Sequence, residues 1–351
     1  MTPELLAAAG KALGRPLSEV ARLAGGERAH VVRATVDGGP ETVVVKAHAP
    51  GHVDNWRRES AALTVLGGRG LPVPELLAVV ADPPLVVLRD LGTGPNLADA
   101  LLGDDAARAT TMLHAWADTL ARLHTATTGD AARLAAASGT DPSTVDVMPA
   151  LLDEAAGTLA DLLPTLGIAP EPRALDELRA APDALSPGAH ALTPADACPD
   201  NNVLTPDGLV LLDFEQADHQ HVAWDAAYLI VPWPTCWCSW GLPAEVARTA
   251  LERWRAAAPS IVDSDLDVTV SAWAFLSTAW FLRGAFEEAD TPPGGGLRGP
   301  TRRAVIRHRM RLAAERPDVL PRLATLAERV LAATESRWGD APLADAPAYR
   351  S

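Results

Sequence analysis

Residues 191–215 read ALTPADACPDNNVLTPDGLVLLDFE, and this segment says more about the fold than any other part of the chain. Two short apolar runs, 203–204 and 209–212, flank the turn residues Thr-Pro-Asp-Gly, a pattern that predicts a β-hairpin. Asp196 and Asn201 lie in the loop before the hairpin, and Asp213 ends its second strand. The segment therefore predicts that two carboxylates and an amide face one cleft.

These side chains are of the types that phosphoryl transfer requires. A carboxylate orients and deprotonates the attacking hydroxyl group, and oxygen ligands hold Mg²⁺ on the nucleotide phosphates. Asp and Asn are also ordinary turn residues, so each one alone indicates little. Their order carries the interpretation, because Asp-x-x-x-x-Asn followed by a strand-terminal Asp-Phe is typical of protein kinases and their small-molecule relatives.

The chain before residue 92 has the pattern of a small antiparallel sheet with one helix. β-Branched runs separated by turn residues predict strands at 20–23, 30–36, 42–46, 76–80 and 85–88, and helical spacing predicts a helix over 55–66. A turn at Gly25 and Gly26 separates the first two strands. Lys46 ends an apolar strand, from which an ammonium can reach nucleotide phosphates and pair with Glu59 on the helix. Residues 1–91 are therefore predicted to form a nucleotide-binding lobe.

The lysine count supports a role for Lys46. Of the 30 basic residues only Lys11 and Lys46 are lysines, and the other 28 are arginines. The arginine excess is compatible with a bias in base composition. A lysine that falls by chance at the end of this strand is less probable than one required there.

The remainder of the chain is predicted to be mostly helical. Ala- and Leu-rich segments with helical spacing occur at 106–124, 146–163, 172–181, 243–257, 265–288, 301–314 and 320–338. We expect residues 92–338 to form a catalytic and substrate-binding lobe and residues 339–351 to form a flexible tail. The predicted fold class is α+β, with two lobes as in protein kinases.

Composition and charge exclude several functions. A hydrophobic content of 48% excludes a disordered chain, and a net charge of −15 argues against nucleic acid as a partner. The uncharged segments 226–244 and 268–282 contain prolines or are too short to span a membrane. The N-terminus has no signal peptide pattern, and three clustered cysteines are too few for a disulfide framework, so we expect a reducing, cytoplasmic location.

Over residues 18–335 the chain resembles the aminoglycoside phosphotransferase and choline kinase superfamily of small-molecule kinases. The resemblance rests on motifs similar to a hinge between lobes, a helix ending in Leu-His, a catalytic loop, a metal-binding segment and a following helix start, at 86–92, 120–124, 196–201, 212–215 and 223–229. These motifs are specific to the superfamily and not to one substrate.

The resemblance implies a role for each matching residue. It implies Asp196 as the catalytic base, Asn201 and Asp213 as Mg²⁺ ligands, Lys46 and Glu59 as the phosphate-binding ion pair, and Asp225 as a structural brace. Arg89 and Leu91, in the hinge-like motif, and the Gly25-Gly26 turn are implied to contact ATP. The implied activity is the ATP- and Mg²⁺-dependent phosphorylation of a hydroxyl group on a small molecule, by a monomer or homodimer.

One departure keeps a second interpretation open. The superfamily usually has His-Gly before the catalytic Asp, whereas here Pro194 and Ala195 precede Asp196. The alternative is a catalytically impaired pseudokinase that binds nucleotide and acts as a regulatory or scaffold protein. Phosphorylation of a protein substrate is disfavoured, because no long activation-loop-like segment separates Asp213 from Asp225.

Tryptophans are concentrated after the metal-binding segment. In the superfamily this region lines the acceptor site, so Trp233, Trp237 and Trp240, with Glu215, are candidate substrate-binding residues. An aromatic wall in an acidic protein suits a cationic amino compound, such as an aminoglycoside-type antibiotic or a choline-like metabolite. The competing interpretation, that the tryptophans belong to the core, stays open. A zinc site formed by Cys198, Cys236, Cys238, His219 and His221 is disfavoured, because the spacings are not those of structural zinc sites.

Overall fold

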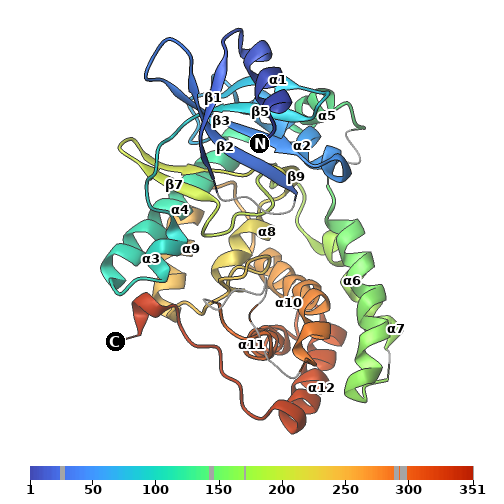
Figure 1. The fold of residues 1–351 in the computed structure, drawn as a ribbon. Helices are drawn as coiled ribbons and strands as arrows, with labels where there is room; N and C mark the ends of the chain where they lie inside the picture. Colours follow the sequence, from blue (N-terminus) through green and yellow to red (C-terminus); the bar gives the residue numbers. More distant parts are fainter. Residues whose placement is uncertain (24–27, 142–145, 170, 288–291, 293–298, 351) are drawn as a thin grey trace.

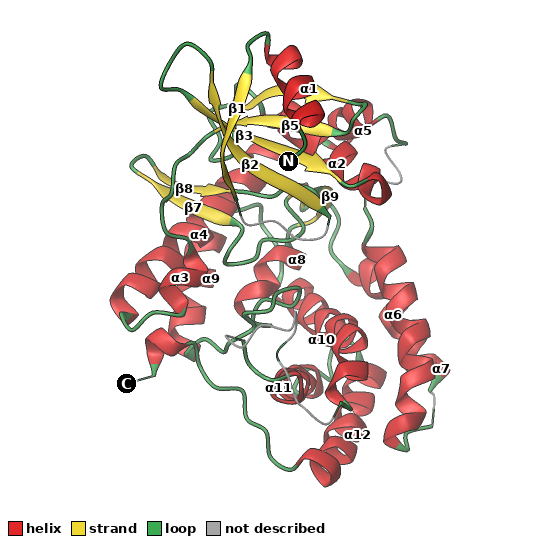
Figure 2. Ribbon diagram, viewed as in Figure 1, coloured by secondary structure: helices red, strands yellow, loops and turns green. Residues whose placement is uncertain are grey.

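The computed structural model describes residues 1–23, 28–141, 146–169, 171–287, 292 and 299–350. Five antiparallel strands form the main sheet in the spatial order β1-β2-β3-β5-β4. Their bounds are β1 Leu17–Arg22, β2 Ala29–Val36, β3 Thr42–His48, β4 Leu76–Val80 and β5 Leu85–Arg89. The sheet forms an N-terminal lobe above a mostly helical C-terminal lobe, as Figure 1 and Figure 2 show. The structure therefore confirms the two-lobed α+β fold.

Two helices, α1 (Pro3–Leu13) and α2 (Val53–Leu66), pack on the main sheet. Side chains alternate between the two faces of a strand, and along β3 they place Val43 and Val45 in a buried cluster with Ala9 of α1. Lys46 lies on the opposite face, which looks toward the C-terminal lobe and toward α2. The alternation of β3 thus determines that its lysine enters the space between the lobes.

The C-terminal lobe is built from helices around one large hydrophobic core. Their bounds are α3 Leu97–Leu101, α4 Ala106–Thr127, α5 Ala131–Ser138, α6 Met148–Leu162, α7 Pro172–Arg179, α8 Ala223–Ala226, α9 Ala244–Ala257, α10 Asp263–Ala285, α11 Arg302–Ala314 and α12 Pro321–Trp338. Helix α10 has buried residues along most of its length, as expected of a helix at the centre of a core. In none of the described helices does length combine with enough apolar character for a membrane span.

Two small sheets carry the functional loop. Strands β6 (His190–Thr193) and β9 (Asp218–His221) pair antiparallel, and β7 (Asn202–Thr205) pairs with β8 (Gly208–Leu211) as the hairpin predicted from sequence. The loop between β6 and β7 contains Asp196 and Asn201, and Asp213 follows β8. The pairing of β6 with β9 was not predicted, because both strands are only four residues long and all four residues of β9 are polar.

The C-terminal segment is packed and does not form the loose tail that the sequence predicted. Gly241 pairs with Asp345 in a parallel β-bridge, and Ala346 is fully buried. The Arg350 guanidinium lies 4.1 Å from the ring centroid of Trp240, and Tyr349 shares a hydrogen bond with Thr110 of α4. These partners lie on two separate segments of the C-terminal lobe, residues 240–241 and α4, which the local sequence of residues 339–351 does not reveal.

Candidate active site

A cleft of about 390 Å³ lies between the lobes and collects most of the predicted nucleotide-binding and metal-binding residues. Apolar side chains line it from both lobes, with Val31 and Val44 on the sheet and Val203 and Leu212 on the hairpin. The polar end of the same cleft is lined by Lys46, Glu59, Asn201 and Asp213, among others. The cleft therefore combines an apolar slot with a charged end, as a nucleotide requires for its base and its phosphates.

Lys46 is the centre of a cluster of carboxylates. Its Nζ lies 3.0 Å from Glu59 Oε2, 2.5 Å from Asp213 Oδ1 and 3.0 Å from Glu215 Oε2. Burial lowers the pKa of the ammonium, but the three carboxylates outweigh burial, so the net pKa of Lys46 lies above its ordinary value. Lys46 is therefore charged at neutral pH.

Glu59 is held in place from a second side by His48, which the sequence analysis did not single out. The Nε2 atom of His48 lies 3.0 Å from Glu59 Oε2, and Glu59 is 1% exposed. Burial raises the pKa of the Glu59 carboxyl, but Lys46 and His48 outweigh it and hold the pKa below its ordinary value. His48 sits two positions after Lys46 on β3, on the same face of the strand, so strand alternation offered a signal for it.

Asp213 and Asn201 are brought together by the hairpin. The N–H group of Leu212 donates to the carbonyl oxygen of Asn201 at 2.8 Å, which places the two predicted metal ligands at one end of the cleft. The Asn201 side-chain NH₂ donates to the carbonyl oxygen of Asp196 at 2.9 Å, so its amide oxygen is the atom left to accept or coordinate. Two hard oxygen donors beside an excess of carboxylates over ammonium fit a divalent cation such as Mg²⁺.

Asp196 lies in the loop between β6 and β7, close to the segment that follows α8. Thr235 donates a hydrogen bond to Asp196 Oδ1 at 2.7 Å. Burial raises the pKa of Asp196 to about 6, the hydrogen bond from Thr235 opposes this rise, and the negative charge of Asp213 adds to it. A carboxylate with a raised pKa in such a setting is a better proton acceptor than an exposed one.

Three residues near this loop adopt backbone conformations that side chains disfavour. Among the described residues, positive φ angles outside glycine occur at Ala195 (54°), Asp213 (60°) and Trp233 (48°). Such conformations cost about 1–3 kcal/mol each and persist where the surrounding structure enforces them. All three flank or form the predicted site, which is the usual location of such strain.

Of the four other residues predicted to contact the nucleotide, two lie among the residues that the structure describes. Arg89 and Leu91 line the cleft, and Arg89 also pairs with Glu75. Gly25 and Gly26 lie outside the described residues. The hinge is fixed by Asp90, which accepts hydrogen bonds from Thr42 at 2.7 Å and from Arg33 Nη2 at 2.9 Å.

Glu215, a predicted substrate-binding residue, lies beside Lys46 and lines the cleft between the lobes. Its carboxylate lies 3.0 Å from Lys46 Nζ and 2.8 Å from Arg28 Nε. A role of Glu215 in substrate binding stays a prediction. The backbone turns sharply at Asp213, where φ is 60°, and this turn accompanies the return of Glu215 to Lys46.

The candidate tryptophan wall separates into different roles. Trp233 is 0% exposed and packs edge-on against Trp116 in the core, so it does not line an open acceptor site in this structure. Trp240 packs beneath Arg350. Trp237 contacts the loop between β6 and β7, because its Nε1–H group donates to Asp200 Oδ2 at 2.8 Å.

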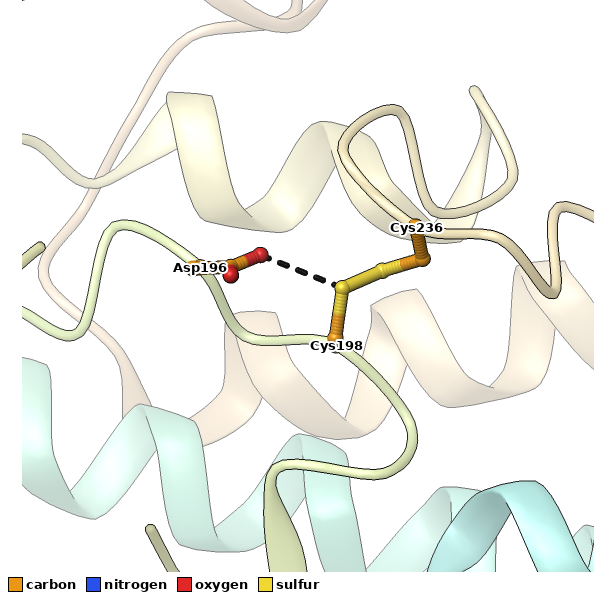
Figure 3. Close-up of side chains that lie close together, drawn as sticks. All are labelled: Asp196, Cys198 and Cys236. Carbon is orange, nitrogen blue, oxygen red and sulfur yellow. Dashed lines mark hydrogen bonds between the residues drawn. A yellow bond between two sulfur atoms is a disulfide. The ribbon is translucent and has the colours of Figure 1, made fainter. Parts of the chain in front are cut away.

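Two cysteines are joined, contrary to the expectation of three reduced thiols. Cys198 and Cys236 form a disulfide bond with a Cα–Cα distance of 6.0 Å, and Cys238 is a buried free thiol. Cys198 Sγ also lies 3.1 Å from Asp196 Oδ1, as Figure 3 shows. The expectation failed because the pairing depends on the packing of the catalytic loop against residues 233–240, which spacing in sequence cannot show.

The disfavoured zinc set is not assembled in the described part of the chain. There, the one group of side chains close enough to share a metal ion is Asp196, Cys198 and Cys236. His219 and His221 lie instead on β9, next to His190 of the paired strand β6.

The disulfide bond determines how many cysteines should react with a thiol reagent before and after reduction. Denatured, unreduced protein is expected to react with a thiol reagent at one cysteine, Cys238, and at all three after reduction. Because the bond closes a loop of 38 residues, its loss is expected to lower the free energy of unfolding by about 2–4 kcal/mol. A colorimetric thiol titration checks the count, and three reactive thiols before reduction would contradict it.

Asp225, the predicted brace, is hydrogen-bonded to side chains of α4 and β9. His124 Nδ1 accepts a hydrogen bond from Trp254 Nε1 at 3.2 Å, so its Nε2 carries the proton that it donates to Asp225 Oδ2 at 3.0 Å. Gln220 of β9 donates to the other carboxylate oxygen at 3.4 Å. The predicted brace thus connects α4, α9 and β9, and β9 in turn pairs with the strand that leads to Asp196.

Comparisons with known proteins agree with this geometry. The sequence model of the phosphotransferase enzyme family matches residues 19–261. No curated protein sequence matches the chain. Among solved structures, the macrolide 2'-phosphotransferase MphH from Brachybacterium faecium superposes with a TM-score of 0.54 at 19% identity, covering 90% of this chain and 99% of its own.

Two further structures share the fold. The ternary complex of streptomycin and ATP with APH(2")-IIa has a TM-score of 0.51 at 13% identity and covers 81% of this chain and 94% of its own. An ethanolamine kinase from Plasmodium vivax has a TM-score of 0.51 at 10% identity and covers 86% of this chain and 82% of its own. At these identities the superpositions establish the fold, and the acceptor must be argued from the site.

Proposed function

This chain belongs to the phosphotransferase enzyme family, and we propose that it transfers the γ-phosphoryl group of ATP to a hydroxyl group of a small molecule, with Mg²⁺ as the metal. One observation carries the proposal. Lys46, bonded to Glu59 and Asp213, lies at the polar end of a cleft that is also lined by Asp200 and Asn201, from the loop that carries Asp196. Phosphoryl transfer needs these groups and little covalent chemistry.

Each side chain has a distinct task in this mechanism. The Lys46 ammonium, held by Glu59, binds and orients the phosphates in the cleft. Mg²⁺ supplies charge neutralisation on the phosphate oxygens, and Asp213 with the amide oxygen of Asn201 would hold it. Asp196 orients the acceptor hydroxyl and accepts its proton as the new O–P bond forms.

The proposed acceptor is a cationic amino compound that bears a hydroxyl group. A net charge of −15 favours such a ligand, and Trp237 with Asp200 offers an aromatic ring and a carboxylate beside the catalytic loop. An acceptor panel of a macrolide, streptomycin, spectinomycin, ethanolamine and choline covers aminated hydroxyl compounds of different sizes. ADP release from ATP and Mg²⁺ in the presence of each panel member identifies the acceptor.

Nucleotide binding is expected to depend on the metal ligands. Titration with ATP should raise the melting temperature more with Mg²⁺ than with a chelator, and Asp213→Ala should remove most of this difference. No change in melting temperature at saturating ATP and Mg²⁺ would contradict the proposed cofactors.

Activity is expected to rise with pH through about 6. Burial raises the pKa of Asp196 to about 6, from 3.8 for an ordinary Asp. The base must be ionised to accept a proton, so kcat/KM should fall about tenfold for each pH unit below this pKa and be constant above about pH 7. A pH–rate profile of the wild-type enzyme checks this, and a profile that is flat between pH 5 and 8 would contradict it.

A further inference from the structure

The segment after α8 reaches the predicted base through one hydroxyl group. Thr235 Oγ1 lies 2.7 Å from Asp196 Oδ1 and 3.1 Å from the hydroxyl group of Tyr228. In the described part of the chain, no protein donor reaches the second carboxylate oxygen of Asp196, Oδ2. The two oxygens of the carboxylate therefore differ, because one is occupied by the protein and the other is available to a ligand.

The number of available protons determines which group donates in the hydrogen bonds that link Tyr228, Thr235 and Asp196. An ionised carboxylate only accepts hydrogen bonds, so the single hydroxyl proton of Thr235 points to Asp196. The Tyr228 hydroxyl must then be the donor toward Thr235, and it also lies 3.4 Å from the carbonyl oxygen of Ala195. Hydrogen bonds linked in one direction strengthen each other in a buried setting.

The backbone that carries Thr235 is rigidly held. Arg309, 1% exposed, donates to the carbonyl oxygens of Pro232 and Trp233, both at 3.3 Å, and to Ser239 Oγ at 3.2 Å. These contacts hold Trp233 at its positive φ angle, two positions before Thr235. The Thr235 hydroxyl is thus presented by a fixed scaffold on one side of Asp196.

The catalytic loop is clamped at the residue before the base. Ala195 has a φ angle of 54°, its N–H group donates to Thr193 Oγ1 at 3.1 Å, and its carbonyl oxygen lies 3.4 Å from the Tyr228 hydroxyl group, whose single proton is directed to Thr235. Tyr228 thus contacts both the backbone before Asp196 and the hydroxyl group that contacts its side chain.

We propose that Thr235 is a positioning residue for the catalytic base: its hydroxyl group, oriented by Tyr228, occupies Asp196 Oδ1 and turns Oδ2 toward the acceptor hydroxyl. This proposal rests on the proposed function, in which Asp196 is the base. Thr235 itself need not touch the acceptor. Its effect is on how often the carboxylate is in the reactive orientation, and orientation affects the rate of the chemical step.

The test is a Thr235→Val substitution, which keeps the shape and removes the hydroxyl group. We expect kcat with the best member of the acceptor panel to fall roughly ten- to hundredfold, and KM for ATP to stay within about twofold of the wild-type value. Thr235→Ser restores the hydroxyl group and should recover most of kcat. A fully active Thr235→Val enzyme, or a Ser variant as slow as the Val variant, would overturn the proposal.

A double-mutant cycle tests the role of Tyr228. Tyr228→Phe alone should reduce kcat, and in the Thr235→Val background it should add little, because Tyr228 acts through Thr235. If the two substitutions instead reduce kcat by independent factors, Tyr228 does not act through Thr235, and the proposed series of hydrogen bonds from Tyr228 through Thr235 to Asp196 is wrong.

Two controls separate the possible failures. Thr269→Val makes the same substitution in α10, where Thr269 bonds only to backbone carbonyl oxygens, and it should leave kcat unchanged. Asp196→Asn is assayed in parallel. If Asp196→Asn is inactive and Thr235→Val is fully active, only the role of Thr235 fails, whereas full activity of Asp196→Asn refutes the proposed base and with it the role of Thr235.

Discussion

Replacing Asp196 by Asn is expected to reduce kcat by about 10²- to 10⁴-fold, the contribution of a general base, while nucleotide binding is retained. The amide is nearly isosteric and can accept the hydrogen bond from Thr235, but it cannot take the proton of the acceptor hydroxyl. Steady-state ADP release with the acceptor panel measures the loss, and titration with ATP and Mg²⁺ measures binding.

Stability provides the control for this variant. Burial raises the pKa of Asp196 from 3.8 to about 6, so its carboxyl group lowers the stability of the protein as pH rises from about 4 to about 6, and the loss is complete above that pH. Asn carries no charge, and Asp196→Asn should therefore be at least as stable as the wild type at pH 8. An inactive variant that melts well below the wild type would indicate damage to the fold, and an active variant would rule out Asp196 as the base.

Lys46→Met is expected to lower kcat/KM for ATP by at least about a hundredfold and to destabilise the protein. The substitution removes the ammonium that orients the phosphates and leaves Glu59, Asp213 and Glu215 facing each other. Removing one partner of a buried ion pair costs about 3–5 kcal/mol. Because protonation relieves repulsion among the carboxylates, the loss of stability should shrink as pH falls. Kinetics and thermal melts between pH 5 and 8 measure both effects.

The chain supplies a matched control, since its other lysine, Lys11, lies exposed in α1. Lys11→Met should change neither activity nor melting temperature appreciably. Lys46→Arg should not restore activity, because a guanidinium fork is too large for a position where three carboxylates surround one nitrogen atom. Wild-type activity in Lys46→Met would contradict the assigned role.

Much of the fold could be predicted because its elements have strong local signals. The strand patterns at 42–46 and 76–80 and the helix patterns at 106–124 and 320–338 correspond to β3, β4, α4 and α12 within a few residues. The short elements α3, β6 and β9 were missed, because four or five residues contain too little periodicity to be distinguished from a loop. Their existence depends on pairing and packing with distant segments.

The site was predicted best where residues act through their position on a strand or hairpin. Lys46, Asn201 and Asp213 meet in the cleft because strand alternation and hairpin pairing place them there. The surroundings of Glu215 and Trp233 could not be predicted, because they depend on distant segments: Glu215 pairs with Lys46 and Arg28, and Trp233 packs against Trp116.

Thr235 could not be singled out from sequence, since nothing in residues 232–240 distinguishes a threonine that contacts Asp196 from one on the surface. The same is true of the pairing of Cys236 with Cys198. Both contacts depend on how this segment packs against the catalytic loop, 39 residues away for Thr235 and 38 for Cys236.

The most direct test of the central claim is a mass measurement of the product. Wild-type protein, ATP and Mg²⁺ are incubated with each member of the acceptor panel, with Asp196→Asn as the blank. We predict that at least one acceptor gains the mass of a single phosphoryl group in the wild-type reaction and not in the blank. Saturable nucleotide binding without a phosphorylated product from any acceptor would contradict the account and favour a nucleotide-binding protein without transferase activity.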